Sequence, residues 1–157
     1  MKRLLLIVLP LLLIVGCSKP INDETLIEED GLMYHPETKE LYSGDVFKNY
    51  LGGKTEYEGS YKNGKQDGLF TYWHENGKKK WEGSVNDGKP DGLLISWYES
   101  GQKWTIGTYK DGKKDGKWTY WHENGQKYSE GIYKVGNVIS EKCWDEVGNE
   151  KDCINTY

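Results

Sequence analysis

A histidine followed by a glutamate occurs twice in this chain, in the sequence Tyr-Trp-His-Glu-Asn-Gly at residues 72–77 and again at 120–125. Such a pair could perform acid–base chemistry, so its repetition could mark a duplicated catalytic site. In the copy between them, residues 96–101 read Ser-Trp-Tyr-Glu-Ser-Gly, which loses the histidine but keeps the tryptophan and the glycine. We therefore interpret His74 and His122 as strand residues beside a turn, rather than as catalysts or metal ligands.

The other candidates for chemistry are few. His35 is the third histidine, and the sequence contains no zinc-protease, nucleophile-elbow or phosphate-loop motif. Asp67, Asp91 and Asp115 each precede a glycine, which is typical of turn residues that bond to their own backbone. The Asn/Asp-Gly-Lys turns lack the dense ligand spacing of a calcium-binding loop. The sequence therefore predicts no catalytic residue, no metal site, no cofactor and no enzymatic activity.

Cys17 closes an apolar N-terminal segment. A cationic Met-Lys-Arg start is followed by an apolar run over residues 4–15, which is shorter than the roughly 20 residues of a membrane span but fits a secretory signal. The sequence Ile-Val-Gly-Cys at its end resembles the lipobox of bacterial lipoproteins. This resemblance implies removal of residues 1–16 and attachment of lipid to Cys17, whereas the alternative is an ordinary signal peptide with an incidental cysteine. Ser18 then implies the outer membrane, if the cell is Gram-negative, with the protein facing away from the cytoplasm.

The repeated phrase is one part of a 24-residue repeat, whose units begin near residues 34, 58, 82, 106 and 130 without a gap. The units that begin at 58 and 106 share 15 of 24 positions. Each unit has an aromatic and β-branched segment, an Asn-Gly turn, a return segment and a second Gly-containing turn, and this pattern predicts two strands per unit. We expect an all-β fold over residues 31–157, an elongated antiparallel meander of tandem β-hairpins. The polar, acidic residues 17–30 are predicted to be a flexible tether.

Alternation along the strands places two sets of side chains on opposite faces of the predicted sheet. One face carries the column Trp73, Trp97 and Trp121, and the other carries Phe70, Leu94 and Trp118 together with Tyr72 and Tyr120. The aromatic columns could pack against one another and replace a two-layer core. They could also form a binding platform for sugar rings or for an apolar partner, with Trp73, Trp97, Trp121, Tyr72 and Tyr120 as the candidate binding residues.

Two cysteines lie in the last unit. If the loop of each hairpin is the three residues Glu75–Gly77, Thr71 faces Trp81, and three periods later the facing pair is Cys143 and Cys153. Because the space outside the inner membrane is oxidising and Cys17 is assigned to lipid, we predict a disulfide that closes the C-terminal hairpin. The alternative is a pair of free thiols, and a two-residue loop would put the cysteines out of register.

The segment Tyr-Glu-Gly-Ser-Tyr-Lys-Asn-Gly-Lys at 57–65, followed by Asp67-Gly68 and Tyr72, resembles the MORN repeat. With the added Asn76-Gly77 turn, the unit resembles bacterial MORN-variant proteins of the YwqK type, which are named as antitoxins of toxin–antitoxin systems. The likeness covers about residues 31–141 and fades in the first and last units. It implies an array of β-hairpins that contacts protein or lipid and does not catalyse.

A net charge of −4 gives no basic patch for nucleic acid. We therefore expect a non-enzymatic, lipid-anchored protein of the cell envelope that binds a partner protein through its sheet, as an antitoxin, an immunity factor or a scaffold. The alternative is binding of a glycan or of peptidoglycan through the tryptophan columns.

Overall fold

The computed structural model describes residues 19–153, and within them the fold is all-β, as predicted. Cys17 and the predicted signal lie outside the described residues. The described elements are β1 (Ile21–Asn22), the 3-10 helix η1 (Asp23–Thr25), β2 (Ile27–Glu29), β3 (Leu32–Tyr34), β4 (Gly44–Asn49), β5 (Thr55–Lys62), β6 (Lys65–Gln66), β7 (Gly68–Trp73), β8 (Lys79–Asn86), β9 (Lys89–Trp97), β10 (Lys103–Lys110), β11 (Lys113–Lys114), β12 (Gly116–Trp121), β13 (Lys127–Lys134), β14 (Asn137–Trp144) and β15 (Glu150–Lys151). Over residues 19–153 we find no helix with the length and apolar character needed to cross a membrane.

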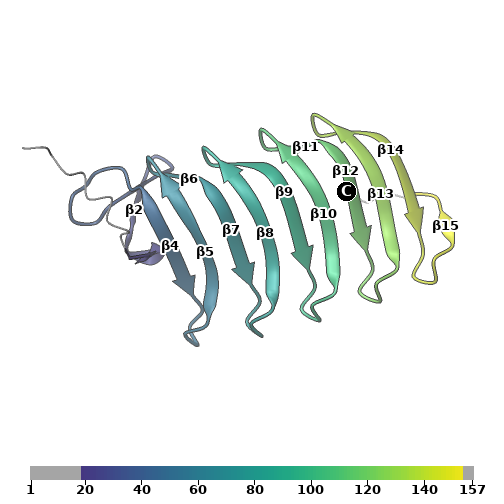
Figure 1. Ribbon diagram of the computed structural model, residues 1–157, viewed down its shortest axis with the longest axis horizontal. Helices are drawn as coiled ribbons and strands as arrows, with labels where there is room; N and C mark the ends of the chain where they lie inside the picture. Colours follow the sequence, from purple (N-terminus) through teal and green to yellow (C-terminus); the bar gives the residue numbers. More distant parts are fainter. Residues whose placement is uncertain (1–18, 154–157) are drawn as a thin grey trace, which may run out of the picture.

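The strands from β4 onward form one long antiparallel sheet in which each hairpin lies beside the next along the molecule (Figure 1). The order is β4-β5-β7-β8-β9-β10-β12-β13-β14-β15, with the short β6 and β11 extending the pairing of β5 and β10. At the N-terminal end β1 pairs in parallel with β4, while β2 and β3 form a separate small hairpin. The predicted meander of tandem hairpins is confirmed.

Two kinds of turn alternate along the sheet. The turns Asn63-Gly64, Asp87-Gly88, Asp111-Gly112 and Val135-Gly136 each have two residues with positive φ, the geometry that suits tight hairpins. The opposite turns are three-residue loops, as in Glu75–Gly77, where the His74 N–H donates to the Lys78 carbonyl at 2.8 Å. A bulge follows the loop, so that Tyr72 faces Trp81 and Thr71 faces Glu82. The predicted pairing of Thr71 with Trp81 was therefore wrong by one residue, because the loop length alone does not reveal the bulge.

We call the two sides of the sheet the tyrosine face and the tryptophan face. The tyrosine face carries Tyr57, Tyr61, Phe70, Tyr72, Trp81, Val85, Thr105, Tyr109, Trp118, Tyr120, Ser129 and Tyr133, and the tryptophan face carries Leu69, Thr71, Trp73, Leu93, Ile95, Trp97, Lys117, Thr119 and Trp121. Most of the buried apolar side chains belong to the tyrosine face, where Phe70 and Trp118 are 0% and 2% exposed.

Glycine on the neighbouring strand lets an aromatic ring lie flat on this single-layer sheet. A Cβ atom at Gly59 would sit 2.3 Å from a ring carbon of Phe70, and one at Gly107 would sit 2.1 Å from a ring carbon of Trp118. The rings then stack with their neighbours, as for Tyr72 and Trp81, whose centroids are 4.2 Å apart. The Glu58-Gly59 and Ile106-Gly107 steps are thus the counterparts of the aromatic residues Phe70 and Trp118.

Residues 21–34 are part of this core, which corrects the prediction of a flexible tether over residues 17–30 for its part from Ile21 onward. From Ile21 onward the chain is ordered, and Ile21, Leu26 and Met33 pack against the cluster that contains Tyr42 and Tyr57. The segment lies over one end of the sheet, next to β4 and β5 (Figure 1). The composition could not predict that this segment is ordered, because individual contacts to the sheet hold it and it has no repeating pattern of its own.

The last unit is one residue shorter than the others. Thr105 pairs with Tyr120, and its counterpart Ser129 pairs with Cys143, so Cys143 occupies the position of Tyr120 on the tyrosine face. The gap-free repeat had placed Cys143 in the position of Thr71, on the opposite face. Loss of one residue before Cys143 moves every following side chain to the other face, because the side-chain period of a strand is two.

Candidate functional site

The two histidines of the repeated phrase join neighbouring hairpin loops. His74 Nε2 lies 3.0 Å from the Trp97 carbonyl oxygen, and His122 Nε2 lies 3.1 Å from the Trp144 carbonyl oxygen. A carbonyl can only accept, so Nε2 carries the hydrogen in both contacts. In the units that alternate with these, tyrosine takes the place of histidine. The hydroxyls of Tyr50 and Tyr98 donate to the carbonyls of Trp73 and Trp121, at 2.6 and 2.7 Å. Histidine and tyrosine thus do the same structural work, which fits the loss of histidine in the middle copy.

The rest of the phrase continues these links. Asn76 Nδ2 donates to the Glu99 carbonyl at 2.8 Å, and Asn124 Nδ2 donates to the Glu146 carbonyl at 2.8 Å. Asn76 Oδ1 also accepts from the Lys78 N–H at 2.9 Å, which closes its own loop. The His-Glu-Asn-Gly sequence therefore fixes each loop and ties it to the following one.

Lysine side chains lie over the tryptophan column. The ammonium nitrogen is 5.9 Å from the ring centroid in the pair Lys79–Trp97 and 5.3 Å in the pair Lys103–Trp121. These distances are typical of cation–π contacts. Trp144 is a further member, not predicted from the sequence, and its ring has Lys127 Nζ at 5.5 Å. The signal that could have found it is its position directly before the last loop, one residue early because of the deletion.

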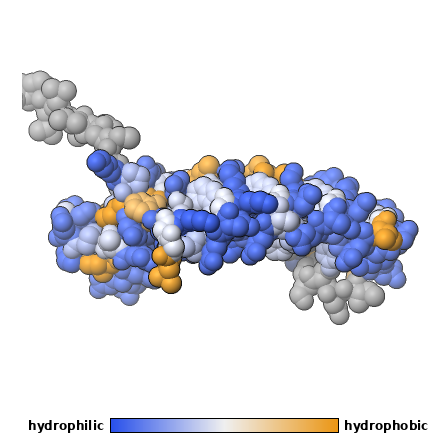
Figure 2. Space-filling view, turned by 90° about the horizontal axis from the view of Figure 1, so that it is seen from below, coloured by the Kyte–Doolittle hydropathy of each residue, from blue (hydrophilic) through white to orange (hydrophobic). Residues whose placement is uncertain are grey.

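The candidate aromatic residues therefore divide between the two faces. Trp73, Trp97 and Trp121 are half-buried on the tryptophan face, and Tyr72 and Tyr120 are half-buried on the tyrosine face. The structure does not bring these two groups into one site. Hydrophilic residues cover most of the surface in the view of Figure 2, and hydrophobic residues form small separate patches.

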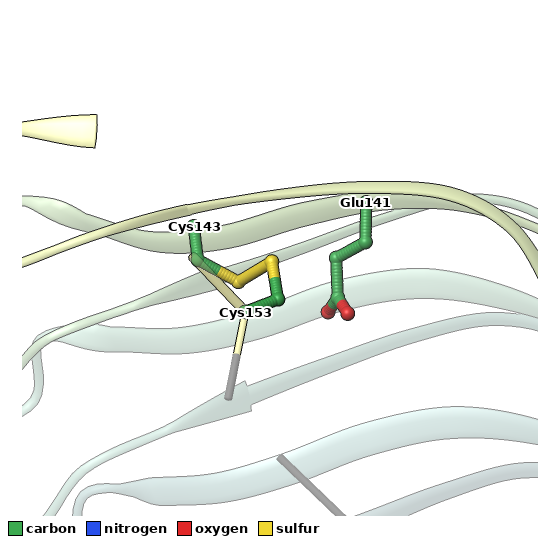
Figure 3. A group of neighbouring side chains, drawn as sticks. All are labelled: Glu141, Cys143 and Cys153. Atoms are coloured by element: carbon green, nitrogen blue, oxygen red, sulfur yellow. A yellow bond between two sulfur atoms is a disulfide. The ribbon is translucent and has the colours of Figure 1, made fainter. Parts of the chain in front are cut away.

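Cys143 and Cys153 are joined by a disulfide, with a Cα–Cα distance of 5.3 Å. They do not face each other directly, because Cys143 is opposite Lys151 and the bond runs diagonally across the last hairpin. The Glu141 carboxylate lies beside them, and the three potential ligand atoms are all within 4.8 Å of one another (Figure 3). Because a metal would require thiolates, the disulfide form leaves only Glu141 as a potential ligand in this group.

Two of the aspartates assigned to turns act on the neighbouring turn of the next unit. Asp115 accepts from Lys134 Nζ at 3.1 Å and from the Val135 N–H at 3.5 Å, and these bonds lower its pKa. Asp67 accepts the equivalent bond from the Asp87 N–H, at 3.4 Å. These contacts are structural, and they resemble the links between the loops on the opposite side.

At the N-terminal end, the tyrosine face holds a carboxylate. The Tyr57 hydroxyl donates to Asp23, which η1 places over the sheet. Burial and the charge of Asp23 raise the pKa of Tyr61 to about 12, and burial together with the Asp23 bond raises the pKa of Tyr57 still further. These tyrosines therefore stay protonated and can donate to the acidic group.

At the C-terminal end, the same face opens into a cavity of about 310 Å³ lined by Trp104, Lys114, Tyr120, Tyr128, Ser129, Tyr133 and Glu141. Lys114 Nζ donates to the Tyr120 hydroxyl at 2.6 Å and lies 4.8 Å from the ring centroids of both Trp118 and Tyr133. Of the residues that line this cavity, only Tyr120 was predicted as a candidate binding residue. Trp104 and Tyr128 were not predicted as binding residues, because they are the extra residues of the bulges.

Comparison with known protein families finds the MORN repeat variant at residues 66–87, 90–111 and 114–134. A search of curated proteins found no match to the chain. The three matched stretches run through consecutive hairpins of the sheet from β6 to β13. Over these three stretches the hairpin array described above is similar to the MORN repeat variant.

Proposed function

We propose that this chain is a binding protein, not an enzyme, and that it holds a partner protein against its β-hairpin sheet. We further propose that Cys17 carries lipid and anchors the chain to a membrane of the cell envelope, the outer membrane in a Gram-negative cell, facing away from the cytoplasm. The MORN-variant repeats are compatible with binding to protein or membrane.

The observation that carries the proposal is that residues 19–153 cover the tyrosine face unevenly. At the N-terminal end, Ile21, Leu26 and Met33 pack against the aromatic cluster. At the C-terminal end, Trp104 is 48% exposed beside an open aromatic cavity. Aromatic residues with polar groups at their edges are enriched in protein interfaces. A surface that is covered at one end by a segment of its own chain is chemically suited to a second polypeptide at the other end.

The role of the partner follows from the location. For a lipid-anchored protein outside the cytoplasm, the antitoxin role implied by the resemblance becomes that of an immunity factor, which meets its toxin in the envelope. A scaffold that holds another envelope protein would use the same surface.

The glycan alternative would use Trp73, Trp97 and Trp121 as stacking platforms. The ammonium groups of Lys79 and Lys103 lie over Trp97 and Trp121, and a sugar ring would have to displace them. This contact favours a protein partner over a glycan.

Photo-crosslinking in cells tests the proposal. A photoreactive amino acid would replace Trp104 on the tyrosine face, Leu93 on the tryptophan face (51% exposed) or Leu51 in a loop, which is fully exposed and serves as the control. We expect a defined adduct with another protein from at least one face and none from Leu51. Absence of a protein adduct from both faces would refute partner binding.

Lipid attachment is tested separately by metabolic labelling with an alkyne fatty acid. We expect labelling of the wild-type chain and none of Cys17→Ser. An unlabelled wild-type protein would refute the anchor without bearing on partner binding.

A further inference from the structure

We propose that the C-terminal half of the tyrosine face binds an acidic side chain of the partner protein, with Lys114 as the cationic contact in the aromatic cavity. The inference rests on the proposed partner binding and names the chemistry of the group that is bound. Four observations carry it.

The first is that the protein already binds a carboxylate on this face. Asp23 reaches the sheet from outside the repeats and accepts the hydroxyl of Tyr57, next to Tyr61 and Tyr72. The segment around Asp23 also places Ile21 and Leu26 against the core. An acidic and partly apolar segment is therefore the kind of ligand that the face holds at its N-terminal end.

The second observation is that this surface recurs 48 residues later. Tyr61, Gln66 and Tyr72 correspond to Tyr109, Lys114 and Tyr120 in the repeat. The correspondence holds in the contacts, since Gln66 interacts with the hydroxyls of Tyr61 and Tyr72.

Lys114 interacts in the same way with its own two tyrosines. Its charge opposes the rise in the pKa of Tyr109, which burial causes, and its Nζ donates to Tyr120. The recurring surface thus carries a cation in place of a neutral amide.

The third observation is that this cation lacks an anionic partner within residues 19–153. The ion pairs of the described chain involve Lys48, Lys65, Lys79, Lys117, Lys127, Lys134 and Lys142. Lys114 is half-buried among aromatic rings, and one of its three N–H donors is used by Tyr120. A half-buried charge is costly without a counter-charge, so an incoming carboxylate would offset the lost hydration.

The fourth observation is the available space. Thr105 and Ser129 stand where the N-terminal half has the larger Tyr57 and Trp81, and Ser129 lines the cavity of about 310 Å³. Its volume lies at the lower end of the range for small-ligand pockets. Glu141 also lines the cavity. Its negative charge repels the partner's carboxylate, so that the carboxylate lies near Lys114 and the affinity is lower than it would be without Glu141.

The test is a peptide titration of the full chain, followed by NMR of its backbone amides. The probe is the end-capped peptide Ile-Asn-Asp-Glu-Thr-Leu, the sequence of residues 21–26, which represents the natural occupant of the N-terminal site. We expect shifts of the amides around Lys114 and Ser129. Lys114→Gln copies the residue that the repeat has at Gln66, so it preserves the fold, and we expect about tenfold weaker binding.

Controls separate this contact from general charge effects. Lys113→Gln removes the same charge from the adjacent, exposed residue, and we expect it to leave the affinity within about twofold of wild type. Glu141→Gln is expected to bind about threefold more tightly, because it removes a repulsive charge. A probe with Asn and Gln in place of its two acidic residues is expected to lose binding.

Equal binding by wild type and Lys114→Gln, or equal binding of the acidic and neutral probes, would overturn the inference. So would shifts confined to the tryptophan face, or a cavity occupied by a second copy of this chain, seen as shifts that depend on protein concentration without the probe. In the crosslinking experiment, an adduct from Leu93 but not from Trp104 would refute this inference and leave the proposed function standing. A lack of adducts from both faces would refute the proposed function even where the peptide binds at Lys114.

Discussion

Replacing Gly107 by alanine tests how this single-layer sheet makes a core. The Cβ of alanine would sit 2.1 Å from Trp118 Cδ2, so the ring has to move. Trp118 is 2% exposed, and its Nε1 donates to the Thr108 carbonyl at 3.1 Å, so it has little room to move without losing that bond. Overpacking costs about 1–3 kcal/mol and the lost hydrogen bond about 1 kcal/mol. Relief of glycine's backbone entropy returns about 0.5–1 kcal/mol. The net expectation is a loss of about 1–3.5 kcal/mol.

Gly83→Ala is the matched control, because Gly83 occupies the same position of the repeat. Its Cβ would lie 3.4 Å from the Leu93 carbonyl and 3.6 Å from Leu94, both ordinary contacts. We expect a change within about 1 kcal/mol, toward higher stability. The assay is equilibrium urea unfolding followed by near-ultraviolet circular dichroism. Equal shifts for the two variants, or an unchanged midpoint for Gly107→Ala, would show that the aromatic ring does not depend on the glycine beneath it.

Three further predictions concern the loops, the turns and the tyrosines. His122→Ala should lower the free energy of unfolding by about 1 kcal/mol, because it loses the bond to Trp144, whereas His122→Tyr should keep it, as Tyr98 does; equal losses would contradict the structural role of the histidine. Val135 has φ of 50°, which is unfavourable for a β-branched residue, so Val135→Asp should stabilise by about 1 kcal/mol and the converse Asp111→Val should destabilise, both measured by urea unfolding; a neutral result in both would refute the strain. Burial and Asp23 raise the pKa of Tyr61 from 10.0 to about 12, so the folded state keeps a proton that the unfolded chain loses. Stability should thus be full below pH 10 and should fall as the pH rises toward 12, and a urea midpoint that stays constant over this interval would contradict the assignment.

The repeating part of the fold was predictable because two local signals agree with each other. The Asn-Gly and Asp-Gly pairs mark tight turns, and the alternation around Phe70 and Trp73 sorts side chains onto two faces. The predicted three-residue loop at Glu75–Gly77 also matches the observed hydrogen bonds. These features depend on residues that are close in the sequence.

The features that escaped prediction depend on distant contacts or on single-residue irregularities. The order of residues 21–30 comes from Asp23 and its neighbours meeting Tyr57, which lies 34 positions away in the chain. The bulge that follows every three-residue loop except the last, at Trp104 for example, leaves no mark in the composition. Two irregularities of the last unit bring the cysteines together. The missing residue places Cys143 on the tyrosine face, and the absence of a bulge in the last hairpin keeps Cys153 on that same face.

Within residues 19–153, the strand pairing of the repeats runs from each unit to the next, and each end of the sheet has its own local closure. The N-terminal segment rests on the first hairpins, and the disulfide lies inside the last one. A whole unit of 24 residues could therefore be inserted or lost between Trp81 and Thr105 without rebuilding either end. Such a chain can change its reach in steps of one hairpin during evolution, and a change of two units would also keep the alternation of histidine and tyrosine at the loops.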